Sequence, residues 1–397
     1  MATDQFPESR PSQLGLAALF LKFLRFGALA FGGPVAQIAM IRQALVEEER
    51  WIDPARFNRL LAVLQVLPGP EAHELCVHLG MVARGRIGGL LAGLGFMLPG
   101  LVLMLLAGWL YTTWVADHAG LSGVLLGVQV AVLAIILRAV VRIGQHIVED
   151  WLLAVIAAAC LLATLAGVPF WIPLVAGGLV YAGSHRPMLA AITLAAAVAV
   201  AVAARLIAMP GADAAIETGA PVTLAALFVA GLKGGLLTFG GAYTAIPYVR
   251  ADTVGRGWIG DATFLDGIAL AGVLPAPLVI FATFVGYVAG GVGGALAITA
   301  GMFLPAFAFS LILFERLEAV VENPALHRIL AGVAAAVVGI IAATFFQLGA
   351  ATDARVPDTL LAVILFALAL AAVWRLKGAW VTPAVVAGGA VAGWLLL

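Results

Sequence analysis

Apolar stretches of about 20 residues recur along nearly the whole of this 397-residue chain, and they constrain its fold more than any other feature. The hydrocarbon core of a bilayer is about 30 Å thick, so a helix needs about 20 apolar residues to cross it. Because only 11% of the residues are charged, against about 25% in an ordinary soluble domain, a soluble globular fold is excluded. We therefore predict an all-α polytopic membrane protein. The predicted spans are 88–112, 119–141, 151–168, 187–208, 293–314, 329–347, 358–374 and 379–397.

The chain also repeats itself, because four short motifs return in the same order about 207 residues later. The pairs are Phe31-Gly32-Gly33 with Phe239-Gly240-Gly241, Trp51-Ile52 with Trp258-Ile259, Pro68-Gly69-Pro70 with Pro275-Ala276-Pro277, and Leu98-Pro99 with Leu304-Pro305. Repeats of this kind are the sequence signature of a duplicated fold. We predict an N-terminal tail over 1–13, a first repeat over 14–208, a joint rich in Gly, Pro and Ala over 209–221, and a second repeat over 222–397.

Each repeat begins with two apolar segments that Gly and Pro interrupt. In the first repeat, 18–31 is followed by 34–46, and 57–67 is followed by 71–83. A helix of about 12 residues is about 18 Å long, which is too short to cross the membrane. Gly and Pro interrupt a helix because Pro lacks a backbone donor and Gly adopts unusual φ angles. Each pair is therefore either a re-entrant hairpin or one broken spanning helix.

The distribution of Lys and Arg favours the hairpin interpretation. Basic residues lie on both sides of 57–83, namely Arg42, Arg50, Arg56 and Arg59 before its tip, and Arg84 and Arg86 after it. Cytoplasmic loops carry an excess of Lys and Arg, and a hairpin leaves both groups on that side. The two halves then become an inverted repeat, a design of secondary transporters in which discontinuous helices meet at a midplane site. A single crossing of each interrupted segment is the alternative.

The tips of these segments predict a binding site for a small anion. After each tip a helix begins within the membrane, and its unpaired N–H groups and positive dipole end favour an anion. Gly32, Gly33, Gly240 and Gly241 allow a ligand to approach the backbone closely, and Pro275 and Pro277 form the last tip. Tight packing of short helices is the alternative use of these residues.

Two basic residues, Arg25 and Lys233, occupy corresponding positions of the repeats. A cation within a bilayer is costly and usually faces a cavity or a partner. We predict that both attract the anion, with snorkelling to the interface as the alternative. Tyr243 is a candidate hydroxyl donor beside the third tip, with packing as its alternative role.

Acidic residues directly follow the second tip. Glu71 and Glu74 fall in the first helical turn, where the helix dipole favours a carboxylate, so capping is a sufficient explanation. A buried carboxyl also carries a coupling proton in many transporters, and the second repeat has no acid there. Glu71, Glu74 and His73 are therefore the candidate proton carriers. His73 and Cys76 lie on a different helix face from Glu74 and His78, so we predict no metal site and no cofactor.

At this point the chain resembles the chromate ion transporter family in its two-domain form. The resemblance is carried by Phe31-Gly32-Gly33-Pro34, Trp51, Leu67-Pro68-Gly69-Pro70, Gly88-Gly89, Phe96-Met97-Leu98-Pro99, Phe239-Gly240-Gly241 and Pro275-Ala276-Pro277. It implies a bacterial inner-membrane carrier that exports chromate, with sulfate as a chemical look-alike. It also implies functional positions at Arg25, Gly32, Gly33, Pro34, Pro68, Gly69 and Pro70. Related sequences often have small or hydroxyl residues where this chain has Glu71.

We therefore predict a secondary transporter for a tetrahedral divalent oxyanion, with chromate as the first candidate. A nucleic-acid partner is not expected, because 21 Lys and Arg balance 21 Asp and Glu. The alternatives are a carrier for sulfate or another oxyanion, a passive anion channel, and a membrane-embedded metal-dependent enzyme or sensor built on Glu71–His78. The sequence leaves open whether protons or exchange drive transport, and whether the protein is a homodimer.

Overall fold

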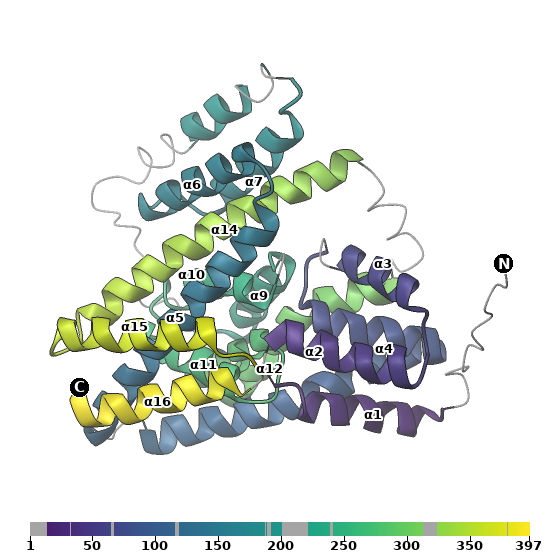
Figure 1. Cartoon of the computed structure of the whole chain (residues 1–397), viewed down its shortest axis with the longest axis horizontal. Coiled ribbons are helices and arrows are strands. Elements are labelled where there is room, and N and C mark those ends of the chain that lie inside the picture. The colour runs from purple at the N-terminus through teal and green to yellow at the C-terminus, as the bar shows by residue number, and fades with distance from the viewer. Residues whose placement is uncertain are drawn as a thin grey trace.

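The computed structural model describes residues 14–31, 33–64, 67–115, 119–186, 188, 192–200, 221–238, 241–312, 324–378 and 380–397. All regular structure in these residues is helical (Figure 1), which confirms the predicted all-α fold. The predicted tail over 1–13, most of the joint, most of the predicted span 187–208, and the tip residues Gly32 and Gly240 lie outside the described residues.

Both repeats contain short helices first and long apolar helices after them. The first repeat comprises α1 (Leu16–Ala28), α2 (Gly33–Arg42) with the π-helical η2 (Gln43–Glu48), α3 (Pro54–Leu64), α4 (Glu71–Leu110) with η3 (Tyr111–Val115), η4 (Ala119–Leu121), α5 (Ser122–Ile147), α6 (Trp151–Leu165) and α7 (Trp171–Ala182). The second comprises α9 (Leu224–Leu236), η5 (Ala242–Ala245), α10 (Ile246–Thr253), α11 (Asp261–Val273), η6 (Leu278–Ile280), α12 (Phe281–Ile312), α14 (Pro324–Asp353), α15 (Thr359–Arg375) and α16 (Val381–Leu396).

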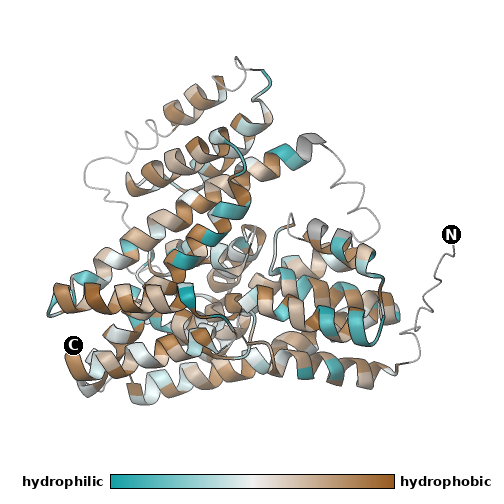
Figure 2. Cartoon of the chain, viewed as in Figure 1, coloured by the Kyte–Doolittle hydropathy of each residue, from teal (hydrophilic) through white to brown (hydrophobic). Residues whose placement is uncertain are grey.

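The helices have the length and surface that a bilayer requires. Within the described residues, four helical stretches are long and apolar enough to cross a membrane: Glu71–Val115, Ser122–Ile147, Leu278–Ile312 and His327–Asp353. Hydrophobic residues dominate the ribbon throughout (Figure 2). Large apolar side chains such as Trp151, Leu162 and Leu368 are exposed, and hydrocarbon is the environment that accepts such a surface. The chain is therefore a multi-pass membrane protein.

The long helices α4 and α12 contain the same sharp turn. Arg84 and Gly85 have φ/ψ of −142°/30° and 61°/−158°, and Gly290 and Gly291 have −146°/23° and 63°/−158°. The positive φ of the second residue is a conformation that glycine adopts without strain. The two turns stand 206 residues apart in the sequence and have the same backbone conformation, so the repeat extends from the sequence to the structure.

Each turn folds a short arm back against a long arm. A Cβ atom placed on Gly80 would lie 2.5 Å from the Gly88 carbonyl oxygen, and one placed on Gly286 would lie 2.6 Å from that of Gly294. Glycine is required on these faces because the two arms of each hairpin approach backbone to backbone. The predicted segment 71–83 is the short arm of α4, and the predicted span 88–112 lies along its long arm.

The interrupted segments fold back at their tips as predicted. Lys22 in α1 forms an ion pair with Glu49, beyond α2, and Lys233 in α9 pairs with Asp252 in α10 at 3.1 Å. Each pair joins residues from the two sides of a tip. The predicted short or broken helices at the start of each repeat are confirmed, whereas the opposite orientation of the two repeats in the membrane stays a prediction.

The two repeats interleave rather than lie apart (Figure 1). Helix α5 of the first repeat packs against α15 and α16 of the second, and α14 of the second packs against α6 and α7 of the first. Helices α4 and α12 pack against each other, with α1 on α4 and α9 on α12. This exchange brings the tips of both repeats to the interior, where the largest cluster of buried apolar side chains also lies.

Candidate functional site

Hydrogen bonds join the tips of one repeat to those of the other. The backbone N–H of Gly69, in the second tip, donates to the carbonyl of Thr238, just before the third tip, at 2.8 Å. The buried amide of Gln37, in α2, donates from Nε2 to the carbonyls of Ala30 and Ala276, each at 2.9 Å. The first tip is thus linked to the fourth and the second to the third, so the hydrogen bonds join the tips in pairs across the two repeats.

A cavity of about 810 Å³ lies beside these tips. Both repeats supply its wall, with Gly33, Pro34 and Val35 from the start of α2 and Gly241, Ala242 and Tyr243 from the third tip. Glu71 at the start of α4, the residues Arg138, Arg142 and His146 of α5, and His327 and Arg328 of α14 also line it. Such a volume holds a small ligand together with water.

Two of the lining residues, Arg138 and Arg142, are functional candidates that the sequence reasoning missed. Both lie within α5 rather than in a loop, and both face the cavity. In the described part of the chain, neither guanidinium group forms an ion pair or a hydrogen bond with another side chain. Their four-residue spacing on an otherwise apolar helix is a signal that the sequence contains, because i and i+4 share one helix face.

The three candidate proton carriers occupy different depths. Glu71 lines the cavity, whereas Glu74 and His73 are fully buried behind it. Neither carboxylate oxygen of Glu74 has a hydrogen-bond partner among the described residues. The ring of His73 packs edge-on against Phe303 and Phe307 of α12, with centroid distances of 4.9 and 4.7 Å. The acidic pair thus extends from the cavity into the contact between α4 and α12.

The other predicted site residues lie in three kinds of position. Gly33, Pro34, Gly241 and Tyr243 line the cavity. Pro68, Gly69, Pro70, Pro275 and Pro277 form the two adjoining tips without lining it, and Gly32 and Gly240 lie outside the described residues. Arg25 is exposed on α1, and Lys233 is paired with Asp252; neither lines the cavity. The roles of Arg25 and Lys233 in binding stay predictions.

No metal site is evident near the tips in the part of the chain that the structure describes. No group of three or more His, Cys, Asp and Glu side chains there is arranged to hold a metal ion. Cys76 and Cys160 are both buried free thiols, and Cys76 belongs to no metal-ligating group among the described residues. The Glu71–His78 segment therefore offers no ligand set within the described residues.

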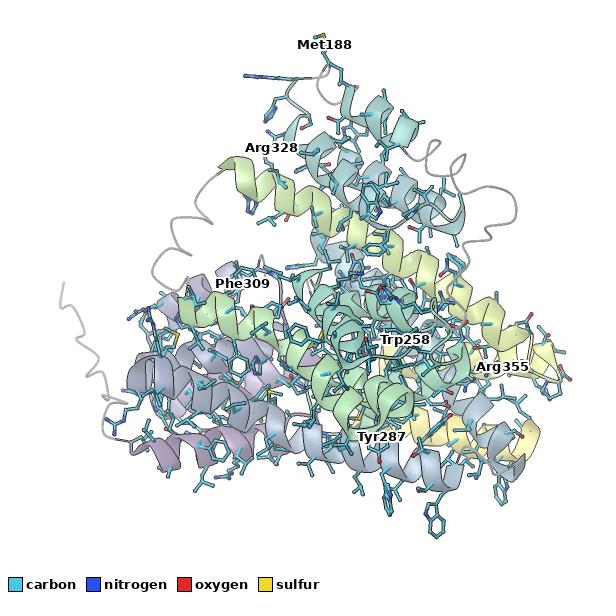
Figure 3. The ribbon with its side chains drawn as sticks, turned by 180° about the vertical axis from the view of Figure 1, so that it is seen from behind. Met188, Trp258, Tyr287, Phe309, Arg328 and Arg355 are labelled. Carbon is cyan, nitrogen blue, oxygen red and sulfur yellow. The ribbon has the colours of Figure 1, made fainter. Side chains whose placement is uncertain are left out.

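One edge of the cavity is closed by a polar cluster around Tyr181. Arg328 donates from Nη2 to the Tyr181 carbonyl at 3.1 Å and to the Ser184 hydroxyl, and its guanidinium lies 5.6 Å from the Tyr181 ring centroid. The Tyr181 hydroxyl donates to Asp150 at 2.8 Å. Figure 3 places Arg328 and Arg355 near opposite ends of α14, so this cluster marks one end of that helix.

Asp150 in this cluster also caps α6. Its Oδ1 accepts from the Leu153 backbone N–H at 2.9 Å. That hydrogen bond, helped by the Tyr181 hydroxyl and the Arg328 charge, holds the pKa of Asp150 below its ordinary value. The carboxylate therefore stabilises the start of α6 at neutral pH.

The sequence matches known proteins over nearly its whole length. The family model described as Chromate transporter matches residues 17–183 and 225–394, one match in each repeat. A chromate transport protein of Pseudomonas aeruginosa is 57% identical, over 100% of this chain and 96% of the relative. A chromate transport protein of Cupriavidus metallidurans is 31% identical, over 95% of this chain and 92% of the relative. No solved structure matches the fold.

Proposed function

The chain belongs to the chromate transporter family, and on this premise we propose that it is a secondary transporter that carries chromate across the membrane. The relatives named above are chromate transport proteins, and their alignments cover at least 95% of this chain. The observation that carries the proposal is the cavity of about 810 Å³, which the Gly33 and Gly241 tips of the two repeats line together.

The chemistry of this wall suits an oxyanion. Gly33 begins α2 and Gly241 precedes η5, so unpaired N–H groups are available at both places. The Tyr243 hydroxyl supplies a further donor. Arg138 and Arg142, which also line the cavity, supply positive charge. The second and fourth tips are hydrogen-bonded to residues next to the third and first tips, which line the cavity. We therefore give a positioning role to the residues that form these two tips: Pro68, Gly69, Pro70, Pro275 and Pro277.

The acidic residues support coupling to protons as part of the same proposal. Glu71 meets the cavity, and Glu74 lies fully buried beside the second tip without a hydrogen-bond partner among the described residues. An isolated buried carboxylate is costly, so binding or release of a proton there changes which conformation is favoured. We assign Glu71 and Glu74 to the proton path and His73 to its buried end.

The proposal extends to export from the cytoplasm across the bacterial inner membrane. Basic residues flanking the spans would then lie in excess on the cytoplasmic side. Sulfate, which has the charge and shape of chromate, is the expected competitor for the same cavity. A homodimer is compatible with the wide apolar exterior, although that surface is also what lipid contact requires.

Uptake of labelled chromate into everted membrane vesicles tests the function directly. Vesicles containing the protein should accumulate chromate above vesicles without it, and sulfate should compete. Gly33→Leu should abolish uptake, because Gly33 has a φ of +77° and the new side chain would enter the cavity. Gly388→Leu is the matched control, since Gly388 is exposed on α16 with open space around it. Equal uptake in vesicles with and without the protein would refute the proposal.

A further inference from the structure

We propose that Arg138 and Arg142 of α5 together bind the transported anion and make the cavity select a divalent oxyanion over a monovalent one. This inference rests on the proposed function and assigns the charge that recognises its substrate. Both residues line the cavity that contains the two glycine tips. Tyr243, beside the third tip, lines the same cavity as both arginines.

Arg138 and Arg142 line the cavity without a side-chain partner among the described residues. In the described residues no ion pair or hydrogen bond satisfies Arg138 or Arg142. Side-chain partners are present for other cations of the described residues, namely Lys22 with Glu49, Arg42 with Glu47, Lys233 and Arg256 with Asp252, Arg250 with Asp261, Arg328 with Ser184, and Arg355 with Gln129. Arg138 is half-buried, whereas Arg142 is exposed, and both line the cavity. A cation without a partner within a membrane protein usually faces a cavity or a substrate pathway.

The positive charges of Arg138 and Arg142 repel each other. Residues i and i+4 lie on one face of a helix, and like charges at that spacing destabilise it. Four residues rise about 6 Å along an α-helix, so the two guanidinium groups stand one turn apart on the cavity wall. An anion bound between them turns this repulsion into two attractions. The two arginines therefore form a site in which a bound anion supplies the missing negative charge.

Two guanidinium groups fit a tetrahedral dianion in both shape and charge. A guanidinium presents a planar fork of N–H donors that matches two oxygens of an oxyanion. Four oxygens suffice for both forks and leave lone pairs for the tip N–H groups at Gly33 and Gly241. The arginine and glutamate side chains that line the cavity are Arg138, Arg142, Arg328, Glu71 and Glu149. When Glu71 is protonated, Arg328 and Glu149 offset each other, and the two positive charges of Arg138 and Arg142 balance a dianion. A monovalent anion of the same shape would leave one positive charge uncompensated.

Transport kinetics with charge-neutralising variants test the inference. In everted vesicles, Arg138→Gln and Arg142→Gln should each raise the KM for chromate by about tenfold to a hundredfold, the range of a lost charge-assisted hydrogen bond. Arg138→Lys and Arg142→Lys should recover part of the affinity, because they restore the charge without the fork. Arg375→Gln is the matched control, since Arg375 is exposed at the end of α15 and lies outside the cavity.

Competition by anions of different charge separates recognition from a structural role. Sulfate is the divalent probe and perchlorate is the monovalent tetrahedral probe. In the wild type, sulfate should inhibit chromate uptake far better than perchlorate, and in either glutamine variant that advantage should shrink by about tenfold or more. A variant that is merely misfolded would lose uptake without changing the ratio of the two inhibition constants.

The possible outcomes distinguish this inference from the proposed function. If the wild type transports chromate and both glutamine variants keep its KM and its sulfate preference, the arginine assignment is wrong while the function stands. If the wild type transports no chromate, the proposed function itself fails. A higher KM in both variants with unchanged sulfate preference would also overturn the claim of charge selection.

Discussion

The backbone N–H of Gly69 donates a 2.8 Å hydrogen bond to the carbonyl of Thr238, and this contact ties the second tip of one repeat to the third tip of the other. The residues that correspond to Thr238 and Gly69 in the other repeat are Ala30 and Ala276. The Gln37 side-chain amide joins these two by donating to both of their carbonyls. The tips are thus held by one backbone link and one side-chain link. This asymmetry makes the two junctions separately testable.

Gly69→Ala tests the direct junction. A Cβ atom at this position would lie 2.5 Å from Glu74 Oε1, and Gly69 has a φ of +150°, which L side chains rarely adopt. Overpacking of this kind costs about 1–3 kcal/mol. We expect lower thermal stability in detergent and reduced chromate uptake.

The matched control for Gly69 is Gly349→Ala. Gly349 lies in α14 with an ordinary helical backbone, and a Cβ atom added to it would have open space within 4 Å. Alanine is favoured over glycine within a helix by about 1 kcal/mol, so this variant should be neutral or slightly stabilised. Equal stability of the two alanine variants would contradict the close contact between Gly69 and Glu74.

Gln37→Leu tests the bridged junction. Leucine has a similar size but no donor, so the buried carbonyls of Ala30 and Ala276 would each lose a hydrogen bond. A buried polar group left without a partner costs about 1–3 kcal/mol. We expect a lower melting temperature and weaker transport. Gln43 is exposed, and among the described residues its amide donates to the exposed Glu48 side chain alone. Gln43→Leu should therefore leave the melting temperature and transport unchanged.

Local features of the fold were predictable because local rules govern them. The sequence predicts breaks in the helices at Gly33 and Pro70. Helix α2 begins at Gly33 and α4 begins at Glu71, each within two residues of the predicted start. The short helices end at Gly and Pro residues, where the chain turns back. The paired motifs predict the corresponding helix ends in the second repeat. Charge, hydropathy and spacing carry this information along the chain.

Contacts between distant segments were not predictable by the same means. The sequence places Arg138 and Arg142 at the end of a predicted span. They line the cavity beside the tips because α5 packs against helices of the second repeat, which the sequence does not show. From the sequence, Gln37 is only a polar residue on a short helix. Its hydrogen-bond partner Ala276 lies 239 residues further along the chain, so local patterns do not reveal the contact. A helix crossing depends on packing in three dimensions, which periodicity along one segment does not specify.

Acid should weaken the capping of α6 by Asp150. The Leu153 backbone N–H holds the pKa of Asp150 below its ordinary value of 3.8, so the folded state favours the carboxylate. The resulting stabilisation is fully present above that ordinary value and is lost as the pH falls through the lowered pKa. Asp150→Ala should therefore lower thermal stability at pH 7, as loss of an N-cap costs about 1 kcal/mol.

The difference between Asp150→Ala and the wild type should shrink below pH 3.8, and melting curves at several pH values measure it. Asp358→Ala is a useful comparison, because Asp358 caps α15 at the corresponding place of the second repeat, with hydrogen bonds of 2.9 and 3.1 Å to the N–H groups of Leu360 and Leu361. A pH-independent effect of Asp150→Ala would show that its carboxylate charge is not what stabilises α6.

Glu74→Gln and Glu71→Gln should separate proton coupling from anion binding. Glu74 is buried behind the cavity and makes no hydrogen bond among the described residues, so glutamine keeps its shape while removing the titrating group. We expect Glu74→Gln to keep the KM for chromate near the wild-type value and to lose the stimulation of uptake by a pH gradient.

Glu71→Gln should behave differently, because Glu71 lines the cavity that contains Arg138 and Arg142. Removing its negative charge leaves more positive charge for the anion, so the KM for chromate should fall, most clearly at the higher end of the pH range where Glu71 is ionised. Initial uptake rates at several chromate concentrations, with and without an imposed gradient, measure both effects. Retention of gradient stimulation in Glu74→Gln, Glu71→Gln and the double variant would exclude these carboxyls from the proton path, since a proton carrier that is absent cannot couple transport to the gradient.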